Sequence, residues 1–133
     1  MTLAAAFVTA FLAAPLAPAV HVQPDSACLH VVGQETPAQQ LRSIAALSAT
    51  RAINTAEAGY HAKTGAFASR EELAPVLDAR FNPSVPEIVP GFTLTLDLTP
   101  KGYWFSVTDT TDPCGYRLIS NQDGLIFTAQ PIR

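Results

Sequence analysis

The stretch TPAQQLRSIAALSATRAINTAEAGYHAKTG, from Thr36 to Gly65, decides the fold. Thr36 can cap a helix, Gln39 completes a capping box, and Pro37 suits the first helical position. No other proline occurs in the stretch, and Gly65 is a typical C-terminal stop. The sequence therefore predicts one long helix over Pro37–Lys63.

One broad face of this predicted helix consists mostly of alanine. We expect this face to pack on a sheet, because small side chains allow a close approach while Ile53 and Tyr60 add bulk. Ile44 and Leu47 lie outside it, on the side of Arg51. They are covered by the N-terminal arm, form a partner surface, or are ordinary exposed apolar residues. The expected sheet-facing residues are Leu41, Ala45, Ala49, Ala52, Ile53, Ala56 and Tyr60.

The second half of the chain predicts a short helix and then a sheet. Ser69 and Glu72 form another capping box, and residues 80–90 carry three prolines typical of a connecting loop. From Phe92 onward, apolar and polar residues alternate with a period of two. We therefore expect an α+β fold, with one long helix on a four-stranded antiparallel meander. The expected strands lie at 92–98, 103–108, around 116–118 and at 125–128.

The composition is rich in apolar residues and poor in charge. The 133 residues are 48% hydrophobic and 14% charged, whereas an ordinary soluble domain is roughly one quarter charged. The length suits one domain with a modest core. Net charge is −3 and the chain has no basic stripe, so we expect no nucleic-acid partner.

Part of the apolar excess lies at the N-terminus, where Met1 to Val20 carry no charge. Pro15 and Pro18 disfavour a membrane-spanning helix, which needs about 20 apolar residues in continuous helix. The sequence indicates a signal peptide over 1–19, although no Lys or Arg precedes the apolar run. The alternative is a buried apolar arm. We expect an extended arm over 20–35, a domain over 36–133, and no membrane span after cleavage.

The two cysteines, Cys28 and Cys114, both lie after this segment. An even cysteine count in an exported protein indicates a disulfide. Such a bond would tie the arm to the C-terminal region. The alternative is a pair of unrelated buried thiols.

Two motifs carry a resemblance to a known family. Arg51–Glu57, followed by Tyr60, 65–68 and Leu73, resembles the helix-to-loop signature of type IV pilin-like proteins, and 115–126 is similar to their closing hairpin. The resemblance implies a helix laid on an antiparallel sheet in an envelope or extracellular setting. The usual processing site and unbroken apolar helix are lacking: no glycine precedes Met1-Thr2-Leu3, and Ala5 replaces the glutamate. We therefore expect a pilin-like head exported alone, which puts filament assembly through that helix in doubt.

The sequence holds no strong catalytic or metal-binding motif. No Gly-x-Ser-x-Gly, HExxH, P-loop or GxGxxG pattern occurs, so we expect no enzyme and no cofactor other than calcium. Calcium binding is a weaker hypothesis. It rests on oxygen ligands in two turns, which a meander could bring together. The resemblance adds to it, since major pseudopilins bind calcium in a C-terminal loop. Ordinary turn chemistry explains the same residues. These are Asp109, Asp112, Asn121 and Asp123.

We expect a non-enzymatic, periplasmic or extracellular domain that acts through protein–protein contacts or self-association, as an accessory or minor component of an envelope or filament system. Its contact surface would combine Ile44 and Leu47 with an exposed edge strand. Of the adjacent strand aromatics Tyr103 and Trp104, one should be core and the other a surface contact. Leu47→Asp should change stability by at most about 1 kcal/mol yet weaken association. The alternative is a soluble small-ligand or calcium-binding module using the turns over 109–123.

Overall fold

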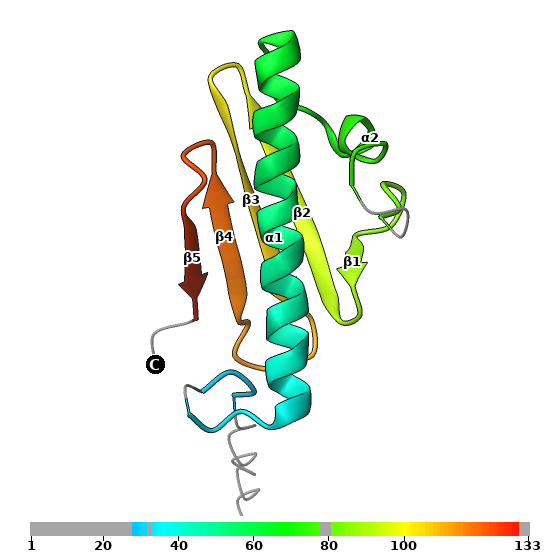
Figure 1. Cartoon of the computed structure of the whole chain (residues 1–133). Helices are drawn as coiled ribbons and strands as arrows, with labels where there is room; N and C mark the ends of the chain where they lie inside the picture. Colours follow the sequence, from blue (N-terminus) through cyan, green and yellow to red (C-terminus); the bar gives the residue numbers. More distant parts are fainter. Residues whose placement is uncertain (1–27, 32, 78–80, 131–133) are drawn as a thin grey trace, which may run out of the picture.

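The computed structural model describes residues 28–31, 33–77 and 81–130, and it has an α+β architecture (Figure 1). The expected signal peptide over 1–19 and the first part of the expected arm, 20–27, lie outside the described residues. The elements are α1 (Pro37–Thr64), α2 (Arg70–Leu73), β1 (Glu87–Val89), β2 (Phe92–Thr99), β3 (Gly102–Asp109), β4 (Arg117–Asn121) and β5 (Ile126–Ala129).

The long helix begins and ends where its capping residues predict. The Thr36 hydroxyl accepts a hydrogen bond from the Gln39 backbone N–H, and the Gln39 side chain accepts one from the Thr36 N–H at 2.7 Å. Gly65 has a left-handed backbone with φ of 74° and donates to His61, which stops α1. Within the described part of the chain, neither helix has the length and apolar character needed to cross a membrane.

The sheet is an antiparallel meander of five strands in the order β1-β2-β3-β4-β5. The predicted meander is confirmed, but the predicted number of four strands was wrong. The missed strand, β1, lies inside the expected loop over 80–90. Its three residues are too few to show alternation, and Pro86 and Pro90 on either side are typical of a loop.

Helix α1 covers one face of the sheet and runs nearly along the strands (Figure 1). The residues it buries are rotated by about a quarter turn from the predicted stripe. Leu41, Ala45 and Ala52 are exposed, and Ala45, Ala49 and Ala52 line a hollow between α1 and the segment formed by Leu77 and residues 81–90. The sequence misled because alanine is compatible with either environment, and the true face includes polar residues. The buried residues of α1 are Ala46, Thr50, Ile53 and Glu57.

The core lies between α1 and the covered face of the sheet. Phe92, Phe105 and Val107 are fully buried there together with Ile53. Tyr103 belongs to this core, whereas its neighbour Trp104 points to the opposite face and is 45% exposed. Of this pair, Tyr103 is therefore the core residue, and Trp104 is the surface residue on the face of the sheet opposite α1.

Candidate functional site

A disulfide joins the N-terminal arm to the loop between β3 and β4. Cys28 and Cys114 are 86 positions apart in sequence and are bonded in the structure, which confirms the predicted pair. Asp112 reinforces the link, because its carboxylate accepts hydrogen bonds from the backbone N–H groups of Leu29, Cys114 and Tyr116 at 3.0, 3.2 and 3.0 Å. Burial alone would raise the pKa of Asp112, but these hydrogen bonds outweigh it and lower that pKa.

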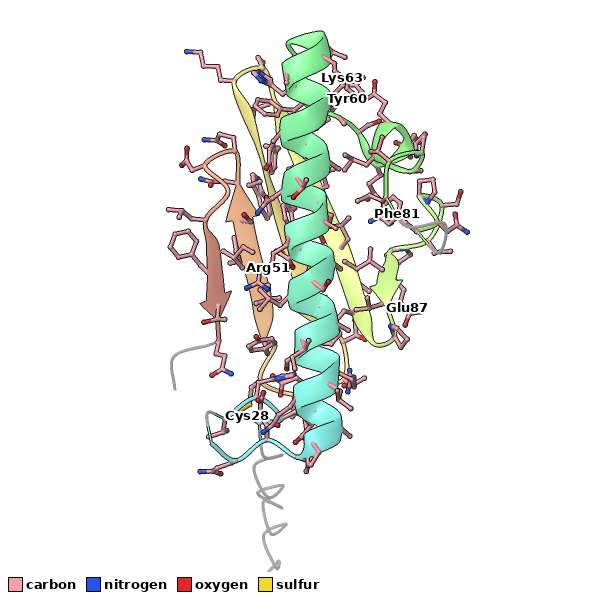
Figure 2. All side chains as sticks on the ribbon, in the orientation of Figure 1. Cys28, Arg51, Tyr60, Lys63, Phe81 and Glu87 are labelled. Carbon is pink, nitrogen blue, oxygen red and sulfur yellow. A yellow bond between two sulfur atoms is a disulfide. The ribbon has the colours of Figure 1, made fainter. Side chains whose placement is uncertain are left out.

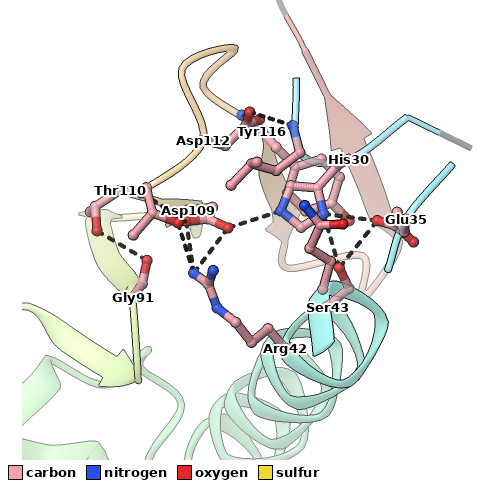
Figure 3. A network of polar contacts seen from close by, with 12 residues as sticks. His30, Glu35, Arg42, Ser43, Gly91, Asp109, Thr110, Asp112 and Tyr116 are labelled. Carbon is pink, nitrogen blue, oxygen red and sulfur yellow. Dashed lines mark hydrogen bonds and ion pairs between the residues drawn. The ribbon is translucent and has the colours of Figure 1, made fainter. Parts of the chain in front are cut away.

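His30 continues the link into the interior (Figure 3). Its side chain is buried, with the residue 4% exposed, and its ring stacks on Tyr116 with the centroids 4.0 Å apart. Nε2 lies 2.8 Å from Asp109 Oδ2, and Nδ1 lies 2.9 Å from Glu35 Oε1. His30 thus bridges two carboxylates, one on the arm and one at the end of β3.

Asp109 is the centre of this polar network. Arg42 Nη2 lies 3.0 and 3.1 Å from its two carboxylate oxygens, and the Thr111 N–H and hydroxyl donate to Oδ1 at 2.8 and 2.7 Å. Burial would raise the pKa of Asp109, but the hydrogen bonds from His30 and Thr111 and the charge of Arg42 lower it. Asp109 therefore fastens α1 and the arm to the sheet, and we name His30, Glu35, Arg42, Asp109 and Asp112 the polar anchor.

A serine also lies beside the histidine of the anchor, a contact that no motif in the sequence predicts. Ser43 Oγ lies 3.0 Å from His30 Nδ1, so Ser43, His30 and Asp109 form the series of contacts used by serine hydrolases. Here Nδ1 also faces Glu35. This ring nitrogen is therefore shared between Ser43 and Glu35 and is not reserved for the serine.

The backbone around Ser43 also lacks the other part of a hydrolase site. Ser43 lies inside α1, where backbone N–H groups are bonded within the helix. They are therefore not free to stabilise an oxyanion. The geometry fits a structural anchor better than a nucleophile and its base. Sequence reasoning missed it because His30 and Asp109 are 79 positions apart and no short motif joins them.

The four residues of the calcium hypothesis do not come together. Asp109 and Asp112 belong to the polar anchor, whereas Asn121 and Asp123 lie at the other end of β4, where Asn121 donates to Asp123 at 3.1 Å. The expectation that the two turns lie near each other was wrong, because all of β4 separates them. Among the described residues, no group of three or more His, Cys, Asp or Glu side chains is arranged to hold a metal ion.

A groove of about 310 Å³ runs between α1 and the strands β4 and β5. Ile44 stands at its margin and is 62% exposed. Leu47 is half-buried and packs against the core, so it is less free than the sequence indicated. The one charged side chain of the lining is Arg51, which lies on the flank of α1 toward β4 and β5 (Figure 2). The lining residues are Ser43, Ile44, Leu47, Arg51, Tyr116, Leu118, Ile126 and Thr128.

The strand wall of this groove is held at both ends. At the start of β5, the Ser120 hydroxyl donates to the Leu125 carbonyl at 2.7 Å. After its end, the Gln130 amide donates to the His30 carbonyl at 2.6 Å. The second contact connects β5 to the polar anchor, so the anchor helps to set the shape of the groove.

Glu57 is a second buried acid, near the other end of α1. It is fully buried, and Oε2 accepts the Ala68 N–H at 2.9 Å, while Oε1 has no hydrogen-bond partner among the described residues. Burial raises the pKa of Glu57, an effect that the Ala68 hydrogen bond opposes. Burial, together with the charges of Glu57 and Asp123, raises the pKa of Tyr103 to about 12. Glu57 holds the loop after α1 against the helix at an electrostatic cost.

The comparisons with protein-family models, with curated proteins and with solved structures found no match for this chain. The function is therefore argued from the groove, the polar anchor and the sequence resemblance.

Proposed function

We propose that this chain is a non-enzymatic exported domain that acts by binding another protein in the groove between α1 and β5. The observation that carries the proposal is Ile44, a large apolar side chain left exposed beside a mostly apolar groove. A groove margin of this kind is typical of a surface that a partner covers. Among the described residues, β5 pairs only with β4, so no described strand lies on the sheet edge next to the groove.

Export is supported by the disulfide between Cys28 and Cys114. Disulfides persist in oxidising compartments and are rare in the cytosol. Together with the signal-like residues 1–19, this bond favours a periplasmic or extracellular location.

The pilin-like assignment is part of the same proposal. The stretch Arg51–Glu57, which resembles the pilin-like signature, lies on α1, and the similar stretch 115–126 spans β4 and the turn before β5. A long helix on one face of an antiparallel sheet is the arrangement that the resemblance implies. These features favour an accessory or minor component of an envelope or filament system.

A non-enzymatic role is favoured by the polar anchor. Its histidine is buried between two carboxylates and joined to a serine inside a helix. These groups satisfy one another and fasten the arm, α1 and β3 together. We therefore assign them to stability and not to chemistry on a substrate.

The test compares Ile44→Asp with Val76→Asp, a matched control at a 58% exposed residue after α2. Both variants should keep the free energy of unfolding within about 1 kcal/mol. In the exported fraction of the producing cells, sedimentation should show the wild type and Val76→Asp in a complex heavier than the 14.1 kDa chain. Ile44→Asp should sediment as the free chain. Equal sedimentation of all three proteins would contradict the proposal.

A further inference from the structure

We infer that the groove binds an extended segment of a different protein, which adds as a strand to β5 and carries an acidic residue two positions from an aliphatic one. This inference rests on the proposed function and specifies its partner. It follows from the outer edge of β5, which pairs with no other strand of the described residues, from the spacing of Leu47 and Arg51, and from the charge of the groove lining.

The edge of β5 is suited to main-chain pairing. The strand Ile126–Ala129 contains no charged residue and no proline, which are the residues that natural proteins use to block edge pairing. Phe127 on this strand is 56% exposed. On an edge strand, alternate residues direct their N–H and C=O groups outward, where an added strand can bond to them.

The adjacent flank of α1 provides side-chain contacts at strand spacing. Leu47 and Arg51 are one helical turn apart, a rise of about 6 Å. Two residues of a strand advance about 6.8 Å, and their side chains point to the same face. Since α1 runs nearly along the strands (Figure 1), side chains at positions i and i+2 of a segment beside β5 would follow the same spacing as Leu47 and Arg51 on the groove lining.

The charge of the groove lining indicates which kind of side chain would lie beside Arg51. Arg51 is exposed, and no ion pair of the described residues involves it. The rest of the lining is apolar or hydroxylic. An acidic side chain beside Arg51 and an aliphatic one beside Leu47 and Ile44 would match this surface.

A second copy of the chain fits the groove less well. Pairing of two β5 strands would bring together two linings that each carry Arg51 and no acidic residue, so neither arginine would find its counter-ion there. The chain's own β5 also lacks an acidic residue. The occupant is therefore assigned to another protein.

The test uses the peptide Thr-Ile-Thr-Glu-Thr-Ile-Thr with both termini blocked. Its sequence reads the same from either end, so parallel and antiparallel pairing with β5 present the same spacing of isoleucine and glutamate. Two control peptides have lysine in place of glutamate, or methylated amide nitrogens at alternate positions. Binding to the full exported chain is followed by titration and by amide chemical shifts. The glutamate peptide should bind about fivefold more tightly than the lysine peptide, shift the amides of β5 but not those of β1, and lose binding when methylated.

Arg51→Glu supplies the matched protein variant, because Arg51 is exposed and its exchange should leave the fold intact. This variant should reverse the preference, so that the lysine peptide binds more tightly. Absence of binding, equal binding by both peptides, a preference unchanged in Arg51→Glu, or shifts at β1 would each overturn the inference. The inference would also be overturned if the chain formed a homodimer that dissociates in the Thr128→Lys variant. None of these outcomes would alter the sedimentation result for Ile44→Asp, which tests whether the groove binds a protein at all. The proposed function and this inference can therefore fail separately.

Discussion

The two edges of the sheet differ in how open they are to another chain. At one edge, β1 has three residues, begins with the charged Glu87, contains an irregularity in its pairing, and lies between Pro86 and Pro90. At the other edge, β5 has four uncharged residues and none of these features. Charge, proline and bulges all discourage edge pairing. The sequence of β1 therefore discourages pairing with another strand, whereas the sequence of β5 carries none of these barriers.

The two edges also differ in how they are held. The loop before β1 is held by Arg70, which donates to the backbone carbonyls of Asn82, Pro83 and Val85 and lies over the Phe81 ring. In contrast, the end of β5 is connected to the polar anchor, because the Gln130 amide donates to the His30 carbonyl. Changes in the anchor should therefore affect β5 more than β1.

The largest expected effect is that of removing the disulfide with Cys28→Ser and Cys114→Ser. The bond spans 86 positions, and its loss should lower the free energy of unfolding by roughly 4–5 kcal/mol in the chain-entropy account. Chemical denaturation of the variant and of the reduced wild type would measure this loss. Native-state amide exchange should rise more at β5 than at β1, and an equal rise would contradict the proposed coupling of β5 to the anchor.

Asp109→Asn should have the next largest effect. The exchange removes the buried charge that faces His30 and Arg42, and breaking such a pair by changing one partner destabilises by about 3–5 kcal/mol. Urea denaturation at pH 7 measures the change. The matched control is Asp123→Asn in the exposed turn, which should change the free energy of unfolding by less than about 0.5 kcal/mol.

The dependence of stability on pH follows from the same carboxylates. The pKa values of Asp109 and Asp112 are lowered in the folded state, so their contribution is fully present above the unfolded value of about 3.9. It should be lost as the pH falls through the lower folded values. Denaturation between pH 2 and 6 should show this loss, and the loss should be smaller in Asp109→Asn. An identical acid profile for both proteins would be evidence against the assigned role of Asp109.

Glu57 should show the opposite sign. Burial raises its pKa in the folded state, so its contribution is present below the ordinary value and is lost as the pH rises through the raised one. Glu57→Gln keeps the shape and removes the buried charge. Above pH 4.5, the ordinary pKa of glutamate, the free energy of unfolding should fall less steeply with pH in this variant than in the wild type. The strand β5 should be unaffected. A steeper decline in the variant would show that the ionised form is stabilising.

The smallest effect on stability, but a large one on binding, is expected for Thr128→Lys. This exchange puts on β5 a lysine, a residue that natural edge strands use to block pairing, at an exposed position beside the groove. The free energy of unfolding should change by about 0.5 kcal/mol or less, while the heavy complex should be lost in sedimentation. Glu87→Gln on β1 is the matched control and should leave the complex unchanged.

The periodic parts of the fold were predictable because their signals are local. Thr36, Gln39 and Gly65 define the limits of α1, and the alternation after Phe92 defines the long strands. The missed strand β1 is stabilised by its pairing with β2, a contact that no local pattern encodes. The rotation of α1 was missed for a related reason, since its buried face includes Thr50 and Glu57.

The candidate site was predictable only in part. Ile44 and the Cys28–Cys114 pair were indicated by the sequence, as an apolar residue off the predicted face and as an even cysteine count. The polar anchor was not, because His30 meets Asp109 only after the meander has formed. The groove likewise depends on where β5 lies beside α1.

The most direct test of the central claim is site-specific photocrosslinking at the two edges. A photoreactive residue is placed at Thr128 on β5 or at Glu87 on β1, both exposed positions, and the exported protein is irradiated in the producing cells. If a partner pairs with β5, heavier adducts to another protein should form from position 128 and none from position 87. Adducts from position 87 alone, or equal adducts from both positions, would contradict it.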